Sequence, residues 1–262
     1  MRFDDYQALR FDRRGRVLTI TMNRPDALNA VDATLHRELS RVFVDAALDP
    51  DSDVIVLTGA GRAFCAGGDV AWMQDAIDHP QSFETTVSEA KAIIFTLLDC
   101  EKPIIARING PAVGLGATLG LFCDVIFADE STYIADPHVS IGMVAGDGGA
   151  VIWPQLIGFA RAKEYLLTGD RIPARRAAEI GLINHAVPAA DLSSVVDAFA
   201  DRLVGGSTKA IRWTKVTTNI ALKQLAHSMM DTGLAYEALT NISDDHRQRV
   251  DAFLKRTASK QR

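Results

Sequence analysis

The stretch AGRAFCAGGDVAWM, residues 60–73, gives the chain its most informative local pattern. It directly follows DVIVLTGA (53–60), an apolar and β-branched run that predicts a buried strand. Gly67 and Gly68 suit a tight turn, and Asp69 can cap the helix that follows. The first amides of a helix have no partner within it, so such a turn can bind a carbonyl oxygen that gains negative charge.

A second stretch, INGPAVGLGATLG (108–120), repeats this order of strand, glycine-rich turn and helix. The strand is expected within KPIIARING (102–110), and the short helix within GLGATLGLF (114–122). Two such turns could each supply one N–H group, which is the minimum for an oxyanion hole. Neither turn has the lysine of a phosphate-binding loop or the trailing acid of a dinucleotide fingerprint.

Strand and helix patterns alternate along the chain up to about residue 187. They predict a hairpin over 8–25, helices over 32–48 and 82–100, and strands over 123–129 and 131–135. This alternation favours α/β layers. From residue 189 to residue 256 the pattern is helical throughout, so we expect a helical tail on an α/β core. The apolar faces of the tail need a surface to cover, either the core or a neighbouring subunit.

Composition narrows the class of protein. The chain has 262 residues, of which 48% are hydrophobic, and this fits one large domain. Its formal net charge of −5 gives no electrostatic reason to expect nucleic acid or an anionic membrane as a partner. The first residues lack the apolar region of a secretory signal, and no apolar run reaches the ~20 residues of a membrane helix. The three cysteines share no metal-type spacing. We therefore expect a soluble, cytoplasmic protein.

Several ordered motifs together resemble one family. AFCAGGD (63–69) resembles the A-F-x-A-G-x-D signature of the crotonase (enoyl-CoA hydratase/isomerase) superfamily, and residues 108–131 are similar to its second signature. Three further segments match other parts of the family pattern: MNRPDALNAV (22–31), LTGDRIPARRAAEIGLINHAVP (167–188) and DDHRQRVDAFLKR (244–256). The resemblance therefore covers nearly the whole chain.

The resemblance implies an α/β fold of the ClpP/crotonase-like type. Residues 1–190 would form a spiral of ββα repeats, and residues 191–262 a helical trimerisation region. The substrate would be an acyl-CoA thioester, with coenzyme A as part of the substrate and no separate cofactor or metal. The chain would assemble as a homotrimer or a dimer of trimers.

The resemblance also implies site residues. The oxyanion donors would be the amides of Gly68 and Leu115. Coenzyme A would be bound by the first family loop and by the segment around the first glycine turn: Arg24, Ala27, Ala66, Gly67, Gly68, Asp69, Val70, Ala71, Trp72 and Leu115. Taken alone, Arg24 is better explained as a solvated surface arginine. Trp72, Met73 and Trp153 could line an acyl pocket or pack in the core.

The sequence departs from the hydratases of this family at both catalytic carboxylates. Those enzymes use two glutamates to hold and deliver water. The first glutamate would fall at Thr118 and the second at His138. Threonine has no proton to exchange near neutral pH, so the two-glutamate hydration cannot run in this site.

The stretch DPHVSIGMVAGDGG (136–149) offers a replacement. His138 can transfer protons, and Asp147, nine positions later, could orient the ring or stabilise its charge. This spacing resembles 6-oxocamphor hydrolase, a crotonase relative that opens cyclic β-diketones. Alternatively, His138 is a satisfied loop residue and Asp147 a turn former. The other histidines show no ligand-like spacing on their expected helix faces or turns: His36, His79, His185, His227 and His246.

Three functional hypotheses follow from this pattern. The first is a lyase or isomerase in which His138 exchanges a proton with an enolate carbon. The second is a hydrolase that cleaves a C–C bond of a β-diketone or a β-keto acyl-CoA, using His138 and Asp147. The third is a relative that binds CoA, or RNA, without turnover; the net charge of −5 argues against RNA.

Overall fold

The computed structural model describes the backbone of residues 3–260 and the side chains of residues 3–255. Its larger sheet has six strands in the order β1-β2-β3-β4-β6-β9, with β1 and β2 antiparallel and the other pairs parallel. These strands are β1 (Leu9–Arg14), β2 (Val17–Met22), β3 (Val54–Gly59), β4 (Ile104–Ile108), β6 (Val125–Asp129) and β9 (His185–Val187). A smaller sheet contains β5 (Ala112–Val113), β7 (Tyr133–Ala135) and β8 (Ile172–Pro173).

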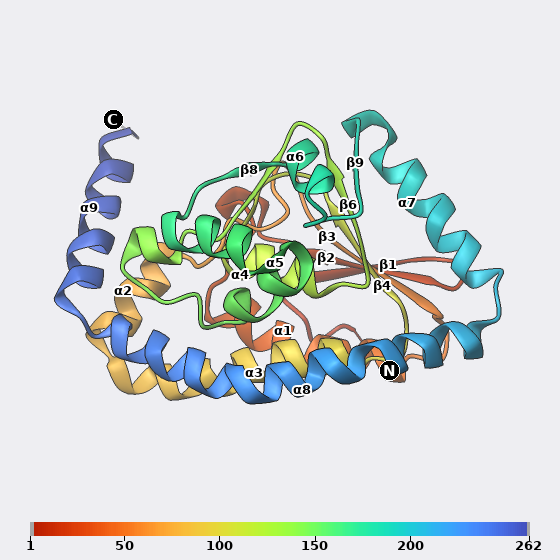
Figure 1. Cartoon of the computed structure of the whole chain (residues 1–262), viewed down its shortest axis with the longest axis horizontal. Coiled ribbons are helices and arrows are strands. Elements are labelled where there is room, and N and C mark those ends of the chain that lie inside the picture. The colour runs from red at the N-terminus through yellow and green to blue at the C-terminus, as the bar shows by residue number, and fades with distance from the viewer. Residues whose placement is uncertain (1–2, 261–262) are drawn as a thin grey trace.

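Helices surround both sheets (Figure 1). They are α1 (Ala33–Leu48), α2 (Val70–Asp78), α3 (Phe83–Asp99), α4 (Leu115–Phe122), α5 (Gly149–Thr168), α6 (Ala174–Glu179), α7 (Ala189–Val204), α8 (Thr208–Asn241) and α9 (Asp244–Lys260). The described residues also form short 3-10 helices: η1 (Pro25–Ala27), η2 (Pro80–Ser82) and η3 (His138–Ile141). The predicted α/β layers are confirmed, as are the hairpin, the strands and the helical C-terminal segment. No helix in residues 3–260 combines the length and apolarity that a bilayer crossing needs.

The central strands of the larger sheet are covered on both faces. All six residues of β3 are buried. Ile55 and Leu57 belong to the main core, whereas Val54 and Val56 point to a second apolar cluster that α7 covers. Burial on both faces explains why β3 is a continuous apolar run and not an alternating one.

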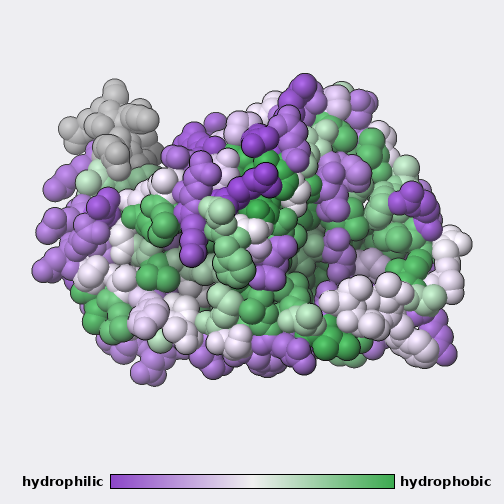
Figure 2. All heavy atoms as spheres, in the orientation of Figure 1, coloured by the Kyte–Doolittle hydropathy of each residue, from purple (hydrophilic) through white to green (hydrophobic). Residues whose placement is uncertain are grey.

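The C-terminal helices extend this core. In Figure 1, α8 runs along α3, α7 lies at one end of the molecule and α9 at the other. Figure 2 shows apolar side chains exposed among polar ones on the same face. Along α8, Trp213, Ile220 and Tyr236 are each more than half exposed. The boundary at residue 190 and the assembly into trimers stay predictions.

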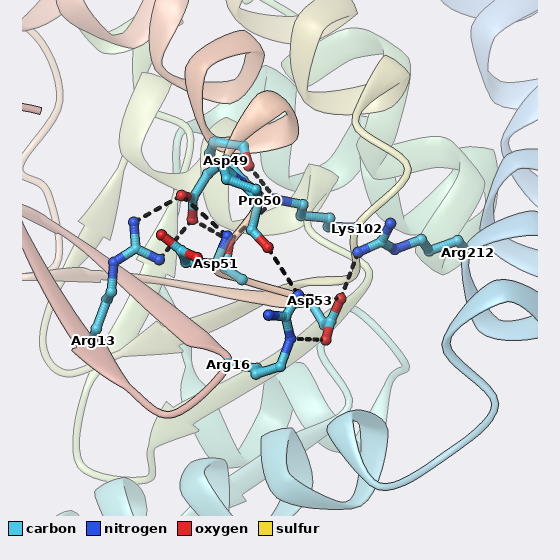
Figure 3. Close-up of polar contacts among 10 residues, drawn as sticks. Arg13, Arg16, Asp49, Pro50, Asp51, Asp53, Lys102 and Arg212 are labelled. Atoms are coloured by element: carbon cyan, nitrogen blue, oxygen red, sulfur yellow. Dashed lines mark hydrogen bonds and ion pairs between the residues drawn. The ribbon is translucent and has the colours of Figure 1, made fainter. Parts of the chain in front are cut away.

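A buried carboxylate ties the β1–β2 hairpin to the end of α1 (Figure 3). Both terminal nitrogens of Arg13 donate to the carboxylate of Asp49 at 2.8 Å, and Ser52 Oγ donates to it at 2.6 Å. Burial alone would raise the pKa of Asp49, but the hydrogen bonds from Arg13 and Ser52 outweigh it and lower that pKa to about 2.

The same network reaches the C-terminal helices. Asp53 pairs with Arg16 from the hairpin and accepts a hydrogen bond of 2.7 Å from Arg212 on α8. Lys102, just before β4, donates to the carbonyl of Ala46 in the last turn of α1 at 2.7 Å. These contacts fix the edge of the sheet against α1 and α8, and so hold the scaffold that carries the two glycine turns.

Replacing Asp49 tests this network. Because the folded state favours the Asp49 carboxylate, its contribution is fully present above the ordinary pKa of 3.8 and is lost as the pH falls towards 2. We expect Asp49→Asn to lower the free energy of unfolding by about 2 kcal/mol at neutral pH, and the difference from wild type to shrink below pH 3.8. Urea unfolding across this pH range measures it.

The matched control is Asp12→Asn, which removes an exposed carboxylate whose ion pair, with Arg10, is exposed as well. Its effect should stay within about 0.5 kcal/mol. A loss for Asp49→Asn that does not change with pH would contradict the assignment.

Candidate active site

The first glycine turn is held by backbone bonds to the segment after η1. Val31 N donates to the carbonyl of Gly67 at 2.8 Å, and Asp69 N donates to the carbonyl of Val31 at 2.9 Å. Gly67 has a φ of +88°, a conformation that favours glycine. The intervening amide, that of Gly68, donates to no acceptor among the hydrogen bonds of residues 3–260.

The second glycine turn lies directly beside the first. Cys65 N donates to the carbonyl of Pro111 at 3.1 Å, and Val113 N donates to the carbonyl of Cys65 at 2.9 Å. A Cβ atom on Gly116 would lie 2.6 Å from the Cβ atom and the carbonyl oxygen of Cys65, so only glycine permits this approach. Leu115 is the first residue of α4, and its amide likewise has no acceptor within the described chain.

Two cavities meet at these turns. The inner one, of about 80 Å³, is lined by Gly68, Trp72, Leu115, His138, Asp147 and Glu237, with apolar walls from Phe83, Met143 and Leu234. The outer one, of about 430 Å³, is lined by Ala66, Gly67, Gly68, Val70, Gly114 and His138, and by Val250 and Phe253 of α9. Gly68 and His138 line both cavities, so they lie where the two meet.

His138 opens η3 and is held between two carboxylates. Its Nδ1 hydrogen-bonds Asp136 Oδ1, and its Nε2 lies 3.7 Å from Asp147 Oδ2. Both acids are buried, with 1% and 6% of their surface exposed. Burial lowers the pKa of His138, but the charges of Asp136 and Asp147 outweigh it and raise that pKa well above the ordinary value. The imidazolium form is therefore favoured.

Thr118 supports Asp147. Thr118 Oγ1 donates to Asp147 Oδ1 at 3.2 Å, and Gly149 N donates to the same oxygen at 3.3 Å. Burial raises the pKa of Asp147, and the charge of His138 opposes that rise. The position expected to hold the first hydratase glutamate thus holds a hydroxyl that orients an acid from another loop.

A third carboxyl group enters the inner cavity from α8. Glu237 is 7% exposed, and its Oε2 has no hydrogen-bond partner within the described residues. Burial, followed by the negative charge of Asp147, raises the pKa of Glu237 to about 8. A carboxyl group with this pKa is mostly protonated at neutral pH and can donate a hydrogen bond to a ligand.

The same groups have the spacing of metal ligands. One ligand-type atom each from Asp136, His138 and Asp147 lies within 4.8 Å of the others. Two of these groups, Asp136 and His138, already share a hydrogen bond. We therefore interpret the cluster as a charge-stabilised imidazole, and the absence of a resident metal stays a prediction.

The sequence-predicted residues divide into two groups. Around the cavities lie Gly68, Leu115, His138, Asp147, Ala66, Gly67, Val70 and Trp72. Asp69 and Ala71 line neither cavity, and Asp69 caps α2 by accepting from Ala71 N at 3.0 Å. Arg24 and Ala27 line neither cavity, and the guanidinium of Arg24 lies 3.1 Å from Asp32 and 3.2 Å from Asp69. A role of Arg24 in binding coenzyme A stays a prediction.

Three side chains at the site were not predicted from the sequence. Asp136 stands two positions before His138 and could have been paired with it from spacing alone. Glu237 lies in a long helix far along the chain and carries no local signal. His36 was placed on a helix face, and it also lines the inner cavity.

Known proteins of one family are similar to this chain over most of its length. The family model for enoyl-CoA hydratase/isomerase matches residues 12–260. A solved enoyl-CoA hydratase/isomerase from Mycobacterium paratuberculosis is 37% identical with a TM-score of 0.91, covering 95% of this chain and 99% of that one. The mitochondrial enoyl-CoA hydratase of Pongo abelii is 33% identical over 251 residues, covering 94% of this chain and 84% of that protein.

The solved structure of an enzyme with a different activity is also similar to this chain. The β-diketone hydrolase of the cyanobacterium Anabaena, bound to (S)-3-oxocyclohexyl acetic acid, is 32% identical with a TM-score of 0.85. The alignment covers 92% of this chain and 96% of that one.

The raised pKa of Glu237 has a measurable consequence. Because the folded state disfavours its charged form, wild type should lose stability relative to Glu237→Gln as the pH rises from about 4.5 to about 8. We expect the variant to gain at least about 1 kcal/mol over wild type between these limits, measured by urea unfolding. Glu164→Gln, at an exposed position of α5, is the control and should show no such trend. A pH-independent difference for Glu237→Gln would contradict the prediction.

Proposed function

The chain belongs to the enoyl-CoA hydratase/isomerase family, and we propose that it is an enzyme that holds the oxyanion of an acyl-CoA thioester and transfers protons through His138. The observation that carries this proposal is the position of His138. The ring stands between two buried carboxylates and lines both cavities beside Gly68.

The oxyanion would be bound by the amides of Gly68 and Leu115. Both residues line the inner cavity, and neither amide is used by the described chain. A thioester oxygen that becomes negative in an enolate gains more from two fixed N–H donors than the neutral carbonyl does. This difference lowers the barrier, typically by about 3 kcal/mol for each donor.

His138 would act as the proton-transfer group. As an imidazolium it can deliver a proton to an enolate carbon, and the neutral ring formed can take one back. Asp136 at Nδ1 orients the ring and balances its charge, which leaves Nε2 as the reactive nitrogen. These roles support a lyase or isomerase that does not depend on the two hydratase glutamates.

A second candidate function is hydrolysis of a C–C bond in a β-diketone or a β-keto acyl-CoA. The likeness to the Anabaena β-diketone hydrolase favours it. The neutral form of His138, which the two flanking carboxylates disfavour, would take a proton from water, and the hydroxide would add to the ketone carbon. The tetrahedral alkoxide would then collapse and break the C–C bond, leaving an enolate on the oxygen held by Gly68 and Leu115. The imidazolium would return its proton to the enolate carbon, so one water is added overall.

The setting of the reaction follows the family resemblance. We infer that coenzyme A enters as part of the substrate, through the outer cavity, and that the reaction needs no further cofactor. We also infer that the protein is cytoplasmic and assembles as a homotrimer or a dimer of trimers. Neither the location nor the oligomeric state bears on the choice between the two reactions.

Removing the imidazole separates these possibilities. With crotonyl-CoA and a cyclic β-diketone assayed side by side, we expect His138→Ala to lower kcat by about 100-fold or more on whichever substrate wild type converts. Because this variant leaves the buried carboxylates of Asp136 and Asp147 without a counter-charge, its unfolding midpoint should fall, and kcat is compared at a temperature where both proteins are folded. The control is His79→Ala, which removes an exposed ring paired with Asp75 at 2.9 Å.

Each outcome of this assay has a clear meaning. Ring opening of the diketone would select the hydrolase, and conversion of the enoyl thioester would select the lyase or isomerase. Strong crotonyl-CoA hydration that survives His138→Ala would overturn the assignment of His138. Binding of acyl-CoA without turnover across a substrate panel would indicate a non-catalytic CoA-binding relative.

A further inference from the structure

A second imidazole lines the inner cavity, and it comes from α1. His36 Nδ1 lies 2.6 Å from Glu89 Oε2 of α3, and the two side chains are 3% and 18% exposed. Helices α1 and α3 pack against each other (Figure 1), so this pair lies inside the protein. The ring centroids of His36 and Trp72, which lines the same cavity, are 5.1 Å apart. Glu89 and Trp72 therefore hold the imidazole in one orientation.

The bond to Glu89 decides what the other ring nitrogen can do. A carboxylate only accepts hydrogen bonds, so Nδ1 of His36 carries the shared hydrogen, and Nε2 of the neutral ring carries a lone pair. Nε2 has no hydrogen-bond partner within residues 3–260, yet it is not fully enclosed, as the partnerless Nε2 of His246 is. Because the ring is otherwise buried and lines the inner cavity, that cavity is the space that Nε2 meets. Nε2 can therefore accept a proton from a molecule bound there.

The other titratable side chains that line the inner cavity are poorly suited to accept a proton. Burial lowers the pKa of His138, but its two flanking carboxylates outweigh this and raise that pKa, so the favoured form has no lone pair. Burial raises the pKa of Glu237 to about 8, so this acid is mostly protonated at neutral pH. Asp147 already accepts two hydrogen bonds at Oδ1, and its Oδ2 balances the charge of His138 from 3.7 Å. His36 is the group left to act as a base.

We propose that His36, with Glu89 behind it, is the general base of this enzyme and that His138 is its general acid. This proposal rests on the proposed function and divides between two rings the proton transfers assigned there to one. A base and an acid that work at the same pH need surroundings that favour opposite protonation states. The cavity provides this difference, because carboxylates lie near both ring nitrogens of His138 and near only Nδ1 of His36.

In the cleavage of a C–C bond, the base would act on water. His36 Nε2 would take a proton from the water, and the hydroxide would add to the ketone carbon. When the alkoxide collapses, the electron pair of the broken C–C bond would form the enolate held by Gly68 and Leu115. His138 would then give its Nε2 proton to the enolate carbon. Glu89 would stabilise the imidazolium formed on His36, and the ring of Trp72 lies within the distance at which an aromatic ring attracts a cation.

In an isomerisation, the same base would act on carbon. His36 Nε2 would take a proton from one carbon of the acyl chain, and the electron pair of that C–H bond would form the enolate. His138 would then protonate a different carbon. Either reaction leaves His36 charged and His138 neutral, so one proton must pass from the first ring to the second, through water, before the next turnover.

His36→Asn tests the base. The asparagine amide can still donate to Glu89, so that acid keeps a partner, but the amide offers no basic nitrogen. On the substrate that wild type converts, we expect kcat to fall by about 100-fold or more, with KM changed by less than about threefold. The loss of kcat/KM towards low pH, which protonation of the base causes in wild type, should disappear. Imidazole added to the buffer should restore part of the activity of this variant.

Glu89→Gln tests the positioning role of the carboxylate. A glutamine can donate to Nδ1 of His36, which would place the ring hydrogen on Nε2 and block the base, so kcat should fall by about 10-fold or more. In ¹⁵N NMR spectra at pH 7.5, Nε2 of His36 should carry no hydrogen in wild type and carry one in Glu89→Gln. Both ring nitrogens of His138 should carry hydrogens in each protein.

The control is His79→Asn. His79 also pairs through Nδ1 with a carboxylate, that of Asp75 at 2.9 Å, but this pair is exposed and lines neither cavity. Its kcat and pH profile should match those of wild type. A folded His36→Asn protein that keeps the wild-type kcat, or keeps the loss of activity towards low pH, would overturn the proposal. A His36–Glu89 pair that only supports the fold would lower the unfolding midpoint without changing the pH profile or allowing rescue by imidazole, which also contradicts it.

The NMR spectra separate this proposal from the proposed function. If wild type converts no substrate, the proposed function fails, and the spectra alone decide whether His36 is the proton acceptor of the inner cavity. A hydrogen on Nε2 of His36 in wild type at pH 7.5 would overturn that role. An Nε2 that gains a hydrogen only in Glu89→Gln would support it.

Discussion

The site depends on one backbone contact, the pairing of Cys65 with the segment from Pro111 to Val113. The two hydrogen bonds of this pairing place the segment that follows β3 against the segment that follows β4. Gly116 removes the side chain that would separate them. Because Gly68 and Leu115 follow these paired residues closely, their two unused amides line one cavity. No side chain creates this arrangement, so it can persist while the acid and base groups around it change.

The second constraint is electrostatic. His138 lies among Asp136, Asp147 and Glu237, and three buried anions around one cation would be strongly destabilising. The raised pKa of Glu237 relieves this, because the third acid is held neutral. A glutamate at position 118 would add a fourth carboxyl group to this cluster, beside Asp147, whereas the hydroxyl of Thr118 only donates to that acid. A hydroxyl at Thr118 and the pair of His138 with Asp147 are therefore compatible in charge.

Much of the fold was predictable from local pattern, and the site only in part. The Asp69 cap, the buried β3 run and the two glycine turns are short-range features, and each lies where the sequence indicated. Glu237 was not predictable, because its place in the cavity depends on how α8 packs and not on its neighbours in sequence. His36 was hidden for the opposite reason: it occupies the buried face of α1, where a histidine among apolar residues is usually structural. Arg24 lies near two aspartates, and its role in binding coenzyme A stays a prediction.

The C-terminal helices cannot be treated as an assembly module alone. Glu237 of α8 reaches the inner cavity, and Val250 and Phe253 of α9 line the outer one. His246 of α9 hydrogen-bonds the carbonyl of Ile141, the last residue of the short helix that begins with His138. Displacement of α9 would therefore loosen the backbone that carries the imidazole, and displacement of α8 would remove the third acid. The proposed boundary at residue 190 divides the chain by secondary structure, but residues from both sides of it line the two cavities.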